Sequence, residues 1–291
     1  SVEMTSLAVL VDGSACAWGA FANAKSEKPG MEKEVLTRVI RSIVTFSNVH
    51  LSLAQSNQLL LYAYGNGMSK KLLYDSARSD NPDSSACIIE GIRGGLRENW
   101  SSGDTRKSGV LAASLATAIC KIRKAATGGT MKNEETISGQ KGRIVVISLL
   151  PEFGSQHSLL MNLFFSAHKH DISIDVVSLG GPSALLQQAA DITAGVFESI
   201  ERVEDLPRIL MTRCLPVSIR SSSSLSTVDY RAACVCHEKL VSNGWTCSVC
   251  LAVLCSFLAI CPSCGAVFKI TVPRRKRKRP TEVGAVPSPR G

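Results

Sequence analysis

Residues 143–150 read Arg-Ile-Val-Val-Ile-Ser-Leu-Leu, a nearly continuous apolar run that is rich in β-branched side chains. A strand with one face in water alternates apolar and polar residues, whereas a strand buried on both faces of a parallel sheet reads as an unbroken apolar run. The length of the run is also that of a strand. These residues therefore predict a strand in a parallel sheet that helices cover on both faces.

The sequence around this strand alternates between strand-like and helix-like patterns. Further apolar runs predict strands at residues 7–11, 59–64, 172–179 and 195–199. Helical spacing of apolar residues predicts helices at 31–48, 87–96, 110–124, 155–169, 182–190 and 203–212. Strands and helices joined by short connections are typical of a doubly wound α/β fold with a mostly parallel sheet. We therefore predict an α/β domain over residues 1–215, with polar residues 127–142 as a surface loop.

The composition changes after this domain. Pro216 and the serines at 221–224 indicate a linker over residues 216–229. Seven of the eleven cysteines then lie between Cys234 and Cys264, which predicts a cysteine-rich zinc-binding module over residues 230–270. Residues 271–291 predict a basic, disordered tail. Its six consecutive basic residues at 274–279 indicate a nuclear import signal, a nucleic-acid contact, or both.

The net charge of +9 comes mostly from that tail, because residues 274–279 supply +6 and leave +3 (9 − 6) for the rest. A body so near neutrality lacks the positive surface that binds phosphates, so we expect DNA contact to be at most indirect or through the tail. No apolar run approaches the roughly 18 residues of a membrane helix, so we expect a soluble protein with no membrane partner. No secretory signal is apparent, so we expect reduced thiols that bind metal rather than pair.

Two C-x-x-C pairs predict a zinc site. Cys247 and Cys250 form the first pair, and Cys261 and Cys264 form the second, ten residues later. Each C-x-x-C turn places two thiolates close enough to share one ion, and two turns complete a tetrahedron.

A second zinc ion has weaker support. Cys234, Cys236, Cys255 and His237 are left over, and three thiols with one imidazole would hold an ion in an interleaved arrangement. Alternatively, no second ion is bound: the C-x-C spacing of Cys234 and Cys236 is too tight for both to be ligands, His237 is exposed to solvent, and Cys255 packs as a small hydrophobe.

The charge of the cysteine module indicates its kind of partner. Residues 230–272 carry three basic side chains and one acidic one, a formal +2, and Zn²⁺ with four thiolates contributes −2. The module is thus near neutral, which is unfavourable for binding phosphates. Its apolar residues predict that it packs on another protein; they are Trp245, Val249, Leu251, Val253, Leu254, Phe257, Leu258 and Ile260.

A loop after the first strand resembles a cation site but departs from it. Asp12 and Ser14 offer hard oxygen ligands, but Cys16 is a soft ligand where a second serine would suit Mg²⁺. Glu152 and Thr105 are the conceivable further ligands. We predict no Mg²⁺ here, no catalytic site, no small-molecule substrate, and no ATPase or nuclease activity. The four scattered cysteines are predicted to be core thiols; they are Cys16, Cys87, Cys120 and Cys214.

Four segments resemble known families. Residues 229–237 read Asp-Tyr-Arg-Ala-Ala-Cys-Val-Cys-His, and with Cys-Ser-Val-Cys at 247–250 they resemble the 34-kDa subunit of the general transcription factor TFIIH. Residues 185–193, Leu-Leu-Gln-Gln-Ala-Ala-Asp-Ile-Thr, resemble it too, and residues 7–16 look like the start of a von Willebrand A domain. The likeness runs from about residue 7 to residue 270, and the cysteine segment is its most specific part.

This resemblance implies a non-catalytic scaffold of the TFIIH core in the nucleus, serving RNA polymerase II transcription initiation and nucleotide excision repair. It implies a von Willebrand A-like domain with a degenerate metal site, which binds the zinc-containing C-terminal part of the 44-kDa subunit. It also supports the paired cysteines as zinc ligands. Two alternatives remain: a RING-like ubiquitin ligase, although the middle C-x-H ligands are missing and Cys255 stands alone, and a direct DNA-binding zinc protein.

Overall fold

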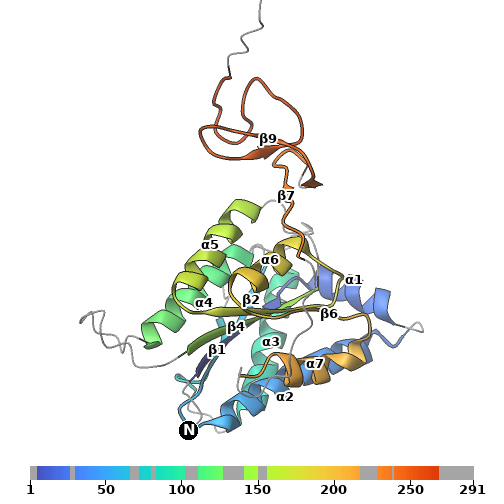
Figure 1. Ribbon diagram of the computed structural model, residues 1–291. Helices are drawn as coiled ribbons and strands as arrows, with labels where there is room; N and C mark the ends of the chain where they lie inside the picture. Colours follow the sequence, from blue (N-terminus) through green and yellow to red (C-terminus); the bar gives the residue numbers. More distant parts are fainter. Residues whose placement is uncertain are drawn as a thin grey trace, which may run out of the picture.

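The computed structural model describes residues 5–26, 30–65, 72–79, 83–101, 111–126, 141–149, 156–216, 228–237 and 239–268 (Figure 1). Several expectations lie wholly or mostly outside these residues. They concern most of the loop at 127–142, most of the linker at 216–229, the basic tail, and the proposed cation ligands Thr105 and Glu152.

A six-stranded sheet forms the centre of the larger domain, in the order β3-β2-β1-β4-β5-β6. Its strands are β1 (Thr5–Asp12), β2 (Gln58–Tyr64), β3 (Leu72–Asp75), β4 (Lys141–Ser148), β5 (Ser173–Ser178) and β6 (Phe197–Ser199). All neighbours pair in parallel except β2 and β3, which are antiparallel. The predicted strand at residues 143–150 is β4, and it lies between β1 and β5, as an unbroken apolar run requires.

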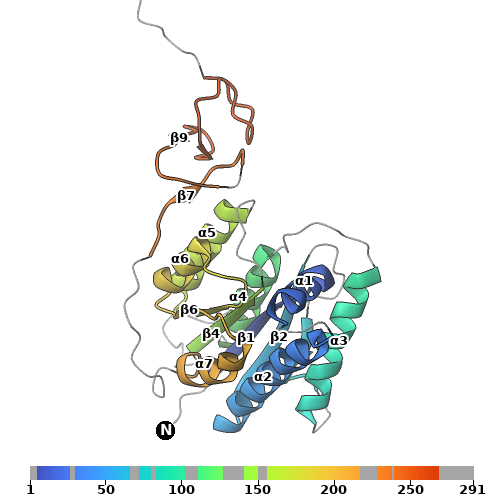
Figure 2. The same ribbon diagram turned by 90° about the vertical axis from the view of Figure 1, so that its right-hand side faces the viewer.

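Helices cover both faces of this sheet (Figure 2). They are α1 (Ala15–Lys25), α2 (Glu32–Leu53), α3 (Ser84–Ser101), α4 (Leu111–Ala126), α5 (His157–Lys169), α6 (Ala184–Ile192) and α7 (Leu206–Arg213). Leu7, Val9 and Val11 of β1 pack in the core with α1, α2, α3 and α7. Ala8 and Leu10 point to the opposite core, with α4, α5 and α6. The structure confirms the doubly wound, mostly parallel α/β fold.

Two elements of the larger domain, α1 and β3, were not predicted from the sequence. Two of the four buried residues of helix α1 are alanines, so only Trp18 and Phe21 mark its buried side. Strand β3 is a four-residue edge strand, too short for a clear alternation. The prediction of four core thiols is wrong for Cys16 and Cys120, which are exposed, because both lie on the solvent side of a helix whose other side faces the sheet.

A buried ion pair links the sheet to its last helix. Nη2 of Arg143 on β4 lies 3.1 Å from Oδ2 of Asp175 on β5, and both side chains are almost fully buried. The same guanidinium donates to the carbonyl of Cys214, the residue that follows α7. Removing one partner of such a pair leaves an uncompensated buried charge. The end of α7 is therefore held against the sheet, and the α/β domain closes there.

No helix among the described residues is both long and apolar enough to cross a membrane.

Candidate metal centre

Three short antiparallel pairs shape the cysteine module, which is described over residues 230–237 and 239–268. Strands β7 (Ala232–Ala233) and β8 (Leu240–Val241) enclose the first turn, and β9 (Trp245–Thr246) and β10 (Val253–Leu254) enclose the second. A bridge between Ile260 and Val267 encloses the third. In each turn the backbone N–H of the leading cysteine donates over 2.9 Å to the carbonyl five residues later; the pairs are Cys234–Lys239, Cys247–Ala252 and Cys261–Ala266.

The three turns are thus copies of one knuckle, with a second ligand three residues after the first. That ligand is Cys250 in the second knuckle and Cys264 in the third, as the C-x-x-C spacing predicts. In the first knuckle it is His237, so Cys234-x-x-His237 is the same motif with an imidazole. The C-x-x-H spacing is visible in the sequence, but it overlaps the C-x-C of Cys234 and Cys236, so no knuckle was predicted there.

The second and third knuckles bring four sulfurs together. The Sγ atoms of Cys247 and Cys264 are 3.7 Å apart, and those of Cys250 and Cys261 are also 3.7 Å apart. A tetrahedral ion with bonds of roughly 2.3 Å to sulfur holds its ligands roughly 3.8 Å apart. The donor set and its spacing therefore fit a four-coordinate metal ion, and the predicted set of four cysteines forms one cluster.

The thiols of this cluster influence each other's ionisation. The backbone N–H of Cys250 lowers the pKa of the Cys247 thiol to about 6. The backbone N–H of Ala266 lowers the pKa of Cys264, but the neighbouring thiols of Cys250 and Cys247 raise it to about 12. Thiolates that share so small a space repel one another, and a bound cation relieves that repulsion.

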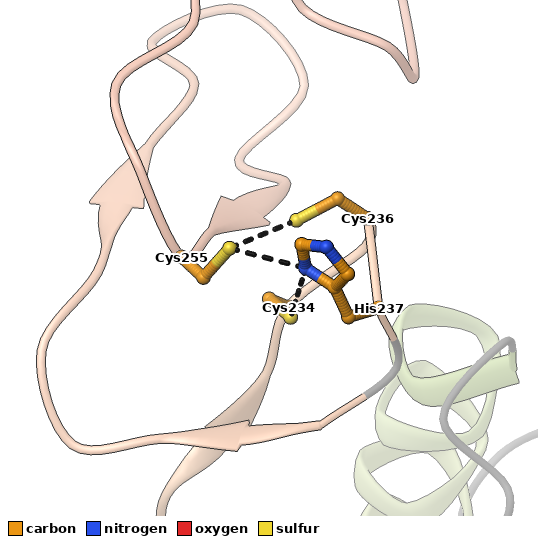
Figure 3. Close-up of side chains that lie close together, drawn as sticks. All are labelled: Cys234, Cys236, His237 and Cys255. Carbon is orange, nitrogen blue, oxygen red and sulfur yellow. Dashed lines mark hydrogen bonds between the residues drawn. The ribbon is translucent and has the colours of Figure 1, made fainter.

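The leftover ligands form a second cluster (Figure 3). Sγ of Cys255 lies 3.2 Å from Sγ of Cys236 and 3.2 Å from Nδ1 of His237, and Sγ of Cys234 lies 4.0 Å from the same nitrogen. All four ligand atoms lie within 4.8 Å of one another, so this cluster can also hold a metal ion. Cys255 does not pack in a core, because the hairpin of β9 and β10 carries it to the first knuckle.

The two clusters interleave along the chain. Cys234, Cys236 and His237 of the second cluster precede Cys247 and Cys250 of the first, and then Cys255 completes the second cluster before Cys261 and Cys264 complete the first. A hydrogen bond of 2.8 Å from the N–H of Val235 to the carbonyl of Val253 joins the hairpin of β7 and β8 to the hairpin of β9 and β10. Residues 247–264 contain all four cysteines of the first cluster, whereas the second cluster combines Cys255 from within that segment with three residues that precede it.

Ligands make up most of the buried interior of the cysteine module. Of its described residues, only Ala233, Leu254 and three cysteines, Cys234, Cys247 and Cys261, are buried. Trp245 and Phe257 pack edge to face with centroids 5.4 Å apart, but both remain exposed. So small an apolar core stabilises a fold poorly, and metal bonds are the usual substitute.

Helix α6 holds the entry of the module against the α/β domain. The entry segment is residues 228–231. The buried side-chain amide of Gln188 donates over 2.7 Å to the carbonyl of Asp229, and the hydroxyl of Tyr230 donates to Asp191. Both views place the module beyond one end of the sheet, next to α5 and α6 (Figures 1 and 2). The segments 185–193 and 229–237, both noted for their resemblance, are thus in contact.

The Asp12 loop lies at the carboxyl end of β1. Oδ1 of Asp12 accepts from the N–H of Ser14 over 2.8 Å, whereas Oδ2 is buried and has no hydrogen-bond partner among the described residues. Burial raises the pKa of Asp12 to about 7, although the bond from Ser14 lowers it. The loop thus holds a carboxyl group that is partly neutral at physiological pH, and Cys16 is exposed on α1. This donor set fits Mg²⁺ poorly.

Comparison with protein families identifies the chain. The family model described as Transcription factor Tfb4 matches residues 4–265, which span the sheet, its helices and all three knuckles. The chain belongs to the Tfb4 family. The resemblance to the 34-kDa subunit of TFIIH is thereby confirmed.

Individual relatives agree with the family match. The Kluyveromyces lactis General transcription and DNA repair factor IIH subunit TFB4 is 31% identical, over 97% of this chain and 90% of that protein. The Dictyostelium discoideum General transcription factor IIH subunit 3 is 34% identical over 58% of this chain, and the match spans only 45% of that protein. The crystal structure of the TFIIH p34 N-terminal domain superposes with a TM-score of 0.58 at 26% identity, covering 71% of this chain and 96% of that one.

Proposed function

We propose that the chain is a non-catalytic structural subunit of the TFIIH core complex, acting in the nucleus in RNA polymerase II transcription initiation and nucleotide excision repair. The observation that carries this proposal is the family match, because it extends without a break from the first strand to the last knuckle. The relatives from Kluyveromyces lactis and Schizosaccharomyces pombe, which match over nine-tenths of this chain, are named as subunits of that factor.

The proposed partner of the von Willebrand A-like domain is the zinc-containing C-terminal part of the 44-kDa TFIIH subunit. The experiment is co-expression of the full chain with that subunit, followed by size-exclusion chromatography. A stable one-to-one complex supports the proposal, and elution of the two as separate species contradicts it. No ATPase or nuclease turnover above background is expected; turnover that Asp12→Asn abolished would refute the non-catalytic assignment.

We further propose zinc as the metal, with two ions per chain. Cys247, Cys250, Cys261 and Cys264 would hold one, and Cys234, Cys236, His237 and Cys255 the other. Four-coordinate sets of thiolates with or without one imidazole are typical ligands of structural zinc. When bound, zinc would supply the folding free energy that the small core of the module lacks.

Atomic emission on the purified full chain tests this count. The wild type should contain two zinc ions per chain, and Cys255→Ser should contain fewer. Cys120→Ser is the matched control, because that cysteine is exposed on α4, outside both clusters, and its loss should leave the ratio at two. A wild-type ratio of one would eliminate the second site and leave the first.

The interleaved order of the clusters favours one alternative, a RING-like ubiquitin ligase. RING modules are zinc sites built from the same ligand types. The test is ubiquitin chain formation with a conjugating enzyme: activity lost in Cys247→Ser would support a ligase, and its absence with a panel of conjugating enzymes would eliminate it.

A direct DNA-binding role is the remaining alternative, and its discriminating measurement is the salt dependence of binding after deletion of residues 271–291. A steep salt slope would indicate phosphate contacts in the folded body.

A further inference from the structure

One knuckle of the cysteine module carries an exposed leucine in a strained backbone conformation. Leu251 has φ of 60°, in the left-handed region, and its side chain is 72% exposed. Its N–H donates over 2.9 Å to the carbonyl of Cys247, which fixes the conformation as part of the knuckle. A left-handed conformation costs an L-residue about 1 kcal/mol, and leucine has no short polar side chain to offset it.

The third knuckle provides an internal comparison. Gly265 occupies the same position, with φ of 72° and the same 2.9 Å hydrogen bond to the carbonyl of Cys261. Glycine adopts this conformation without strain. Folding alone therefore favours glycine at this position of the knuckle. Leu251 adds strain and places an apolar side chain in water, so its contribution lies outside the folding of this chain.

The surroundings of Leu251 are apolar as well. Of the thirteen large hydrophobic side chains exposed among the described residues, ten lie in the entry segment or the cysteine module. Val249 and Leu251 flank Cys250, Ile260 precedes Cys261, and the sulfurs of these two cysteines are 3.7 Å apart. The exposed apolar side chains thus gather around one ligand cluster, whereas the helices of the α/β domain expose few.

Charge decides what kind of molecule fits this surface. Residues 240–268 contain no Asp, Glu, Lys, Arg or His. A phosphate backbone or an anionic membrane requires basic side chains that this surface lacks. Cys250 and Cys264 are exposed, and their cluster is a dianion once zinc is bound, so the complementary charge on a partner is positive.

We propose that Leu251, with Val249 and Ile260 beside it, inserts into an apolar pocket of a protein partner whose rim carries basic side chains. This proposal rests on the proposed function in one respect, because the partner is sought among the TFIIH core subunits. A few well-packed side chains that lose their contact with water near the centre of an interface contribute most of its binding free energy.

The experiment compares Leu251→Gly with the wild type in the full chain co-expressed with the TFIIH core subunits. Glycine keeps the knuckle backbone and removes only the side chain, so the zinc content should stay at the wild-type value. Binding of the purified variant to the core lacking this subunit, measured by biolayer interferometry, should weaken on the order of ten- to a hundred-fold. Leu159→Ala is the matched control: that leucine is 61% exposed on α5, and its replacement should leave binding unchanged.

Three outcomes would overturn the proposal, and they differ from one another. If the wild type binds the core and Leu251→Gly binds equally well with its zinc retained, the pocket is absent while the proposed function stands. If the wild type itself fails to bind, both the pocket and the proposed function fail. If the isolated wild type self-associates in analytical ultracentrifugation and Leu251→Gly does not, the occupant is a second copy of this chain.

Discussion

The buried carboxyl group of Asp12 leads to a prediction about stability and pH. Its pKa is raised from 3.8 to about 7 by burial, and Oδ2 has no hydrogen-bond partner among the described residues. The folded state therefore binds this proton more tightly than the unfolded state does. Well below pH 3.8 the group is protonated in both states and contributes nothing to the pH dependence. As the pH rises from about 4 to about 7 the unfolded state loses its proton first, so the free energy of unfolding falls.

The magnitude follows from the two pKa values. The difference between 3.8 and about 7 corresponds to roughly 4 kcal/mol at 1.36 kcal/mol per pH unit, and this is the full loss above pH 7. Asp12→Asn keeps the oxygen that accepts from the N–H of Ser14 and cannot ionise. The variant should therefore match the wild type near pH 4 and exceed its free energy of unfolding by roughly 2–4 kcal/mol at pH 8.

Urea unfolding of the wild type and the variant, followed by circular dichroism at several pH values, measures this difference. Ser14→Ala is the control: it removes the side-chain oxygen that accepts from the N–H of Ala17 at the start of α1, at a cost of about 1 kcal/mol at every pH. A difference between Asp12→Asn and the wild type that does not change with pH would refute the reasoning. Mg²⁺ should stabilise neither protein; stabilisation of the wild type alone would reveal a cation at this loop.

Three further perturbations test other parts of the fold. Gly195→Ala should destabilise the protein by about 3 kcal/mol or more, because a Cβ there would lie 1.9 Å from a backbone carbonyl of β5. Gly19→Ala is the control: a Cβ at that position of α1 meets open space, so this variant should be neutral or stabilising. Thermal unfolding of the two variants measures the difference. Gln188→Leu should release the entry segment from α6 and so speed tryptic cleavage at the end of that segment. Gln187→Leu, at a more exposed position of the same helix, should leave the cleavage rate unchanged, and equal rates in the two variants would contradict the contact. Burial lowers the pKa of His50 to about 4, so the contribution of His50 to the free energy of unfolding should fall by roughly 3 kcal/mol as the pH drops from 6.5 to 4, opposite in sign to that of Asp12. The difference between the wild type and His50→Gln in urea unfolding isolates this contribution, and a difference that does not change with pH would contradict it.

The fold was largely predictable because its strongest signals are local. An unbroken apolar run identifies β4 as a strand buried on both faces, and helical spacing identifies α2 and α4 with errors of a few residues at their ends. The prediction failed where the local signal is weak. Alanine on the inner side of α1 differs little in hydrophobicity from the residues around it, so the helical spacing is hard to recognise. The position of β3 depends on pairing with β2 rather than on its own four residues.

The exposure of scattered residues was not predictable from their neighbours. Cys16 and Cys120 stand beside apolar residues in the chain but lie on the outer sides of α1 and α4. Which side of a helix faces outward depends on where the sheet lies. For the same reason, the Asp-Gly-Ser sequence does not reveal that Oδ2 of Asp12 is buried without a hydrogen-bond partner among the described residues; this follows from its position at the carboxyl end of the sheet.

The sequence by itself predicted the four cysteines of the first cluster, because each C-x-x-C turn places two thiols close together within four consecutive residues, and two such turns leave little choice of partner. It also determined that the module is uncharged between residues 240 and 268. Only the tertiary structure decided that Cys255 joins Cys234, Cys236 and His237, since this grouping requires two hairpins to pack side by side over eighteen or more residues of chain. It alone showed that Leu251 is held in the left-handed conformation with its side chain in water, because φ and exposure depend on the closed knuckle rather than on the residue.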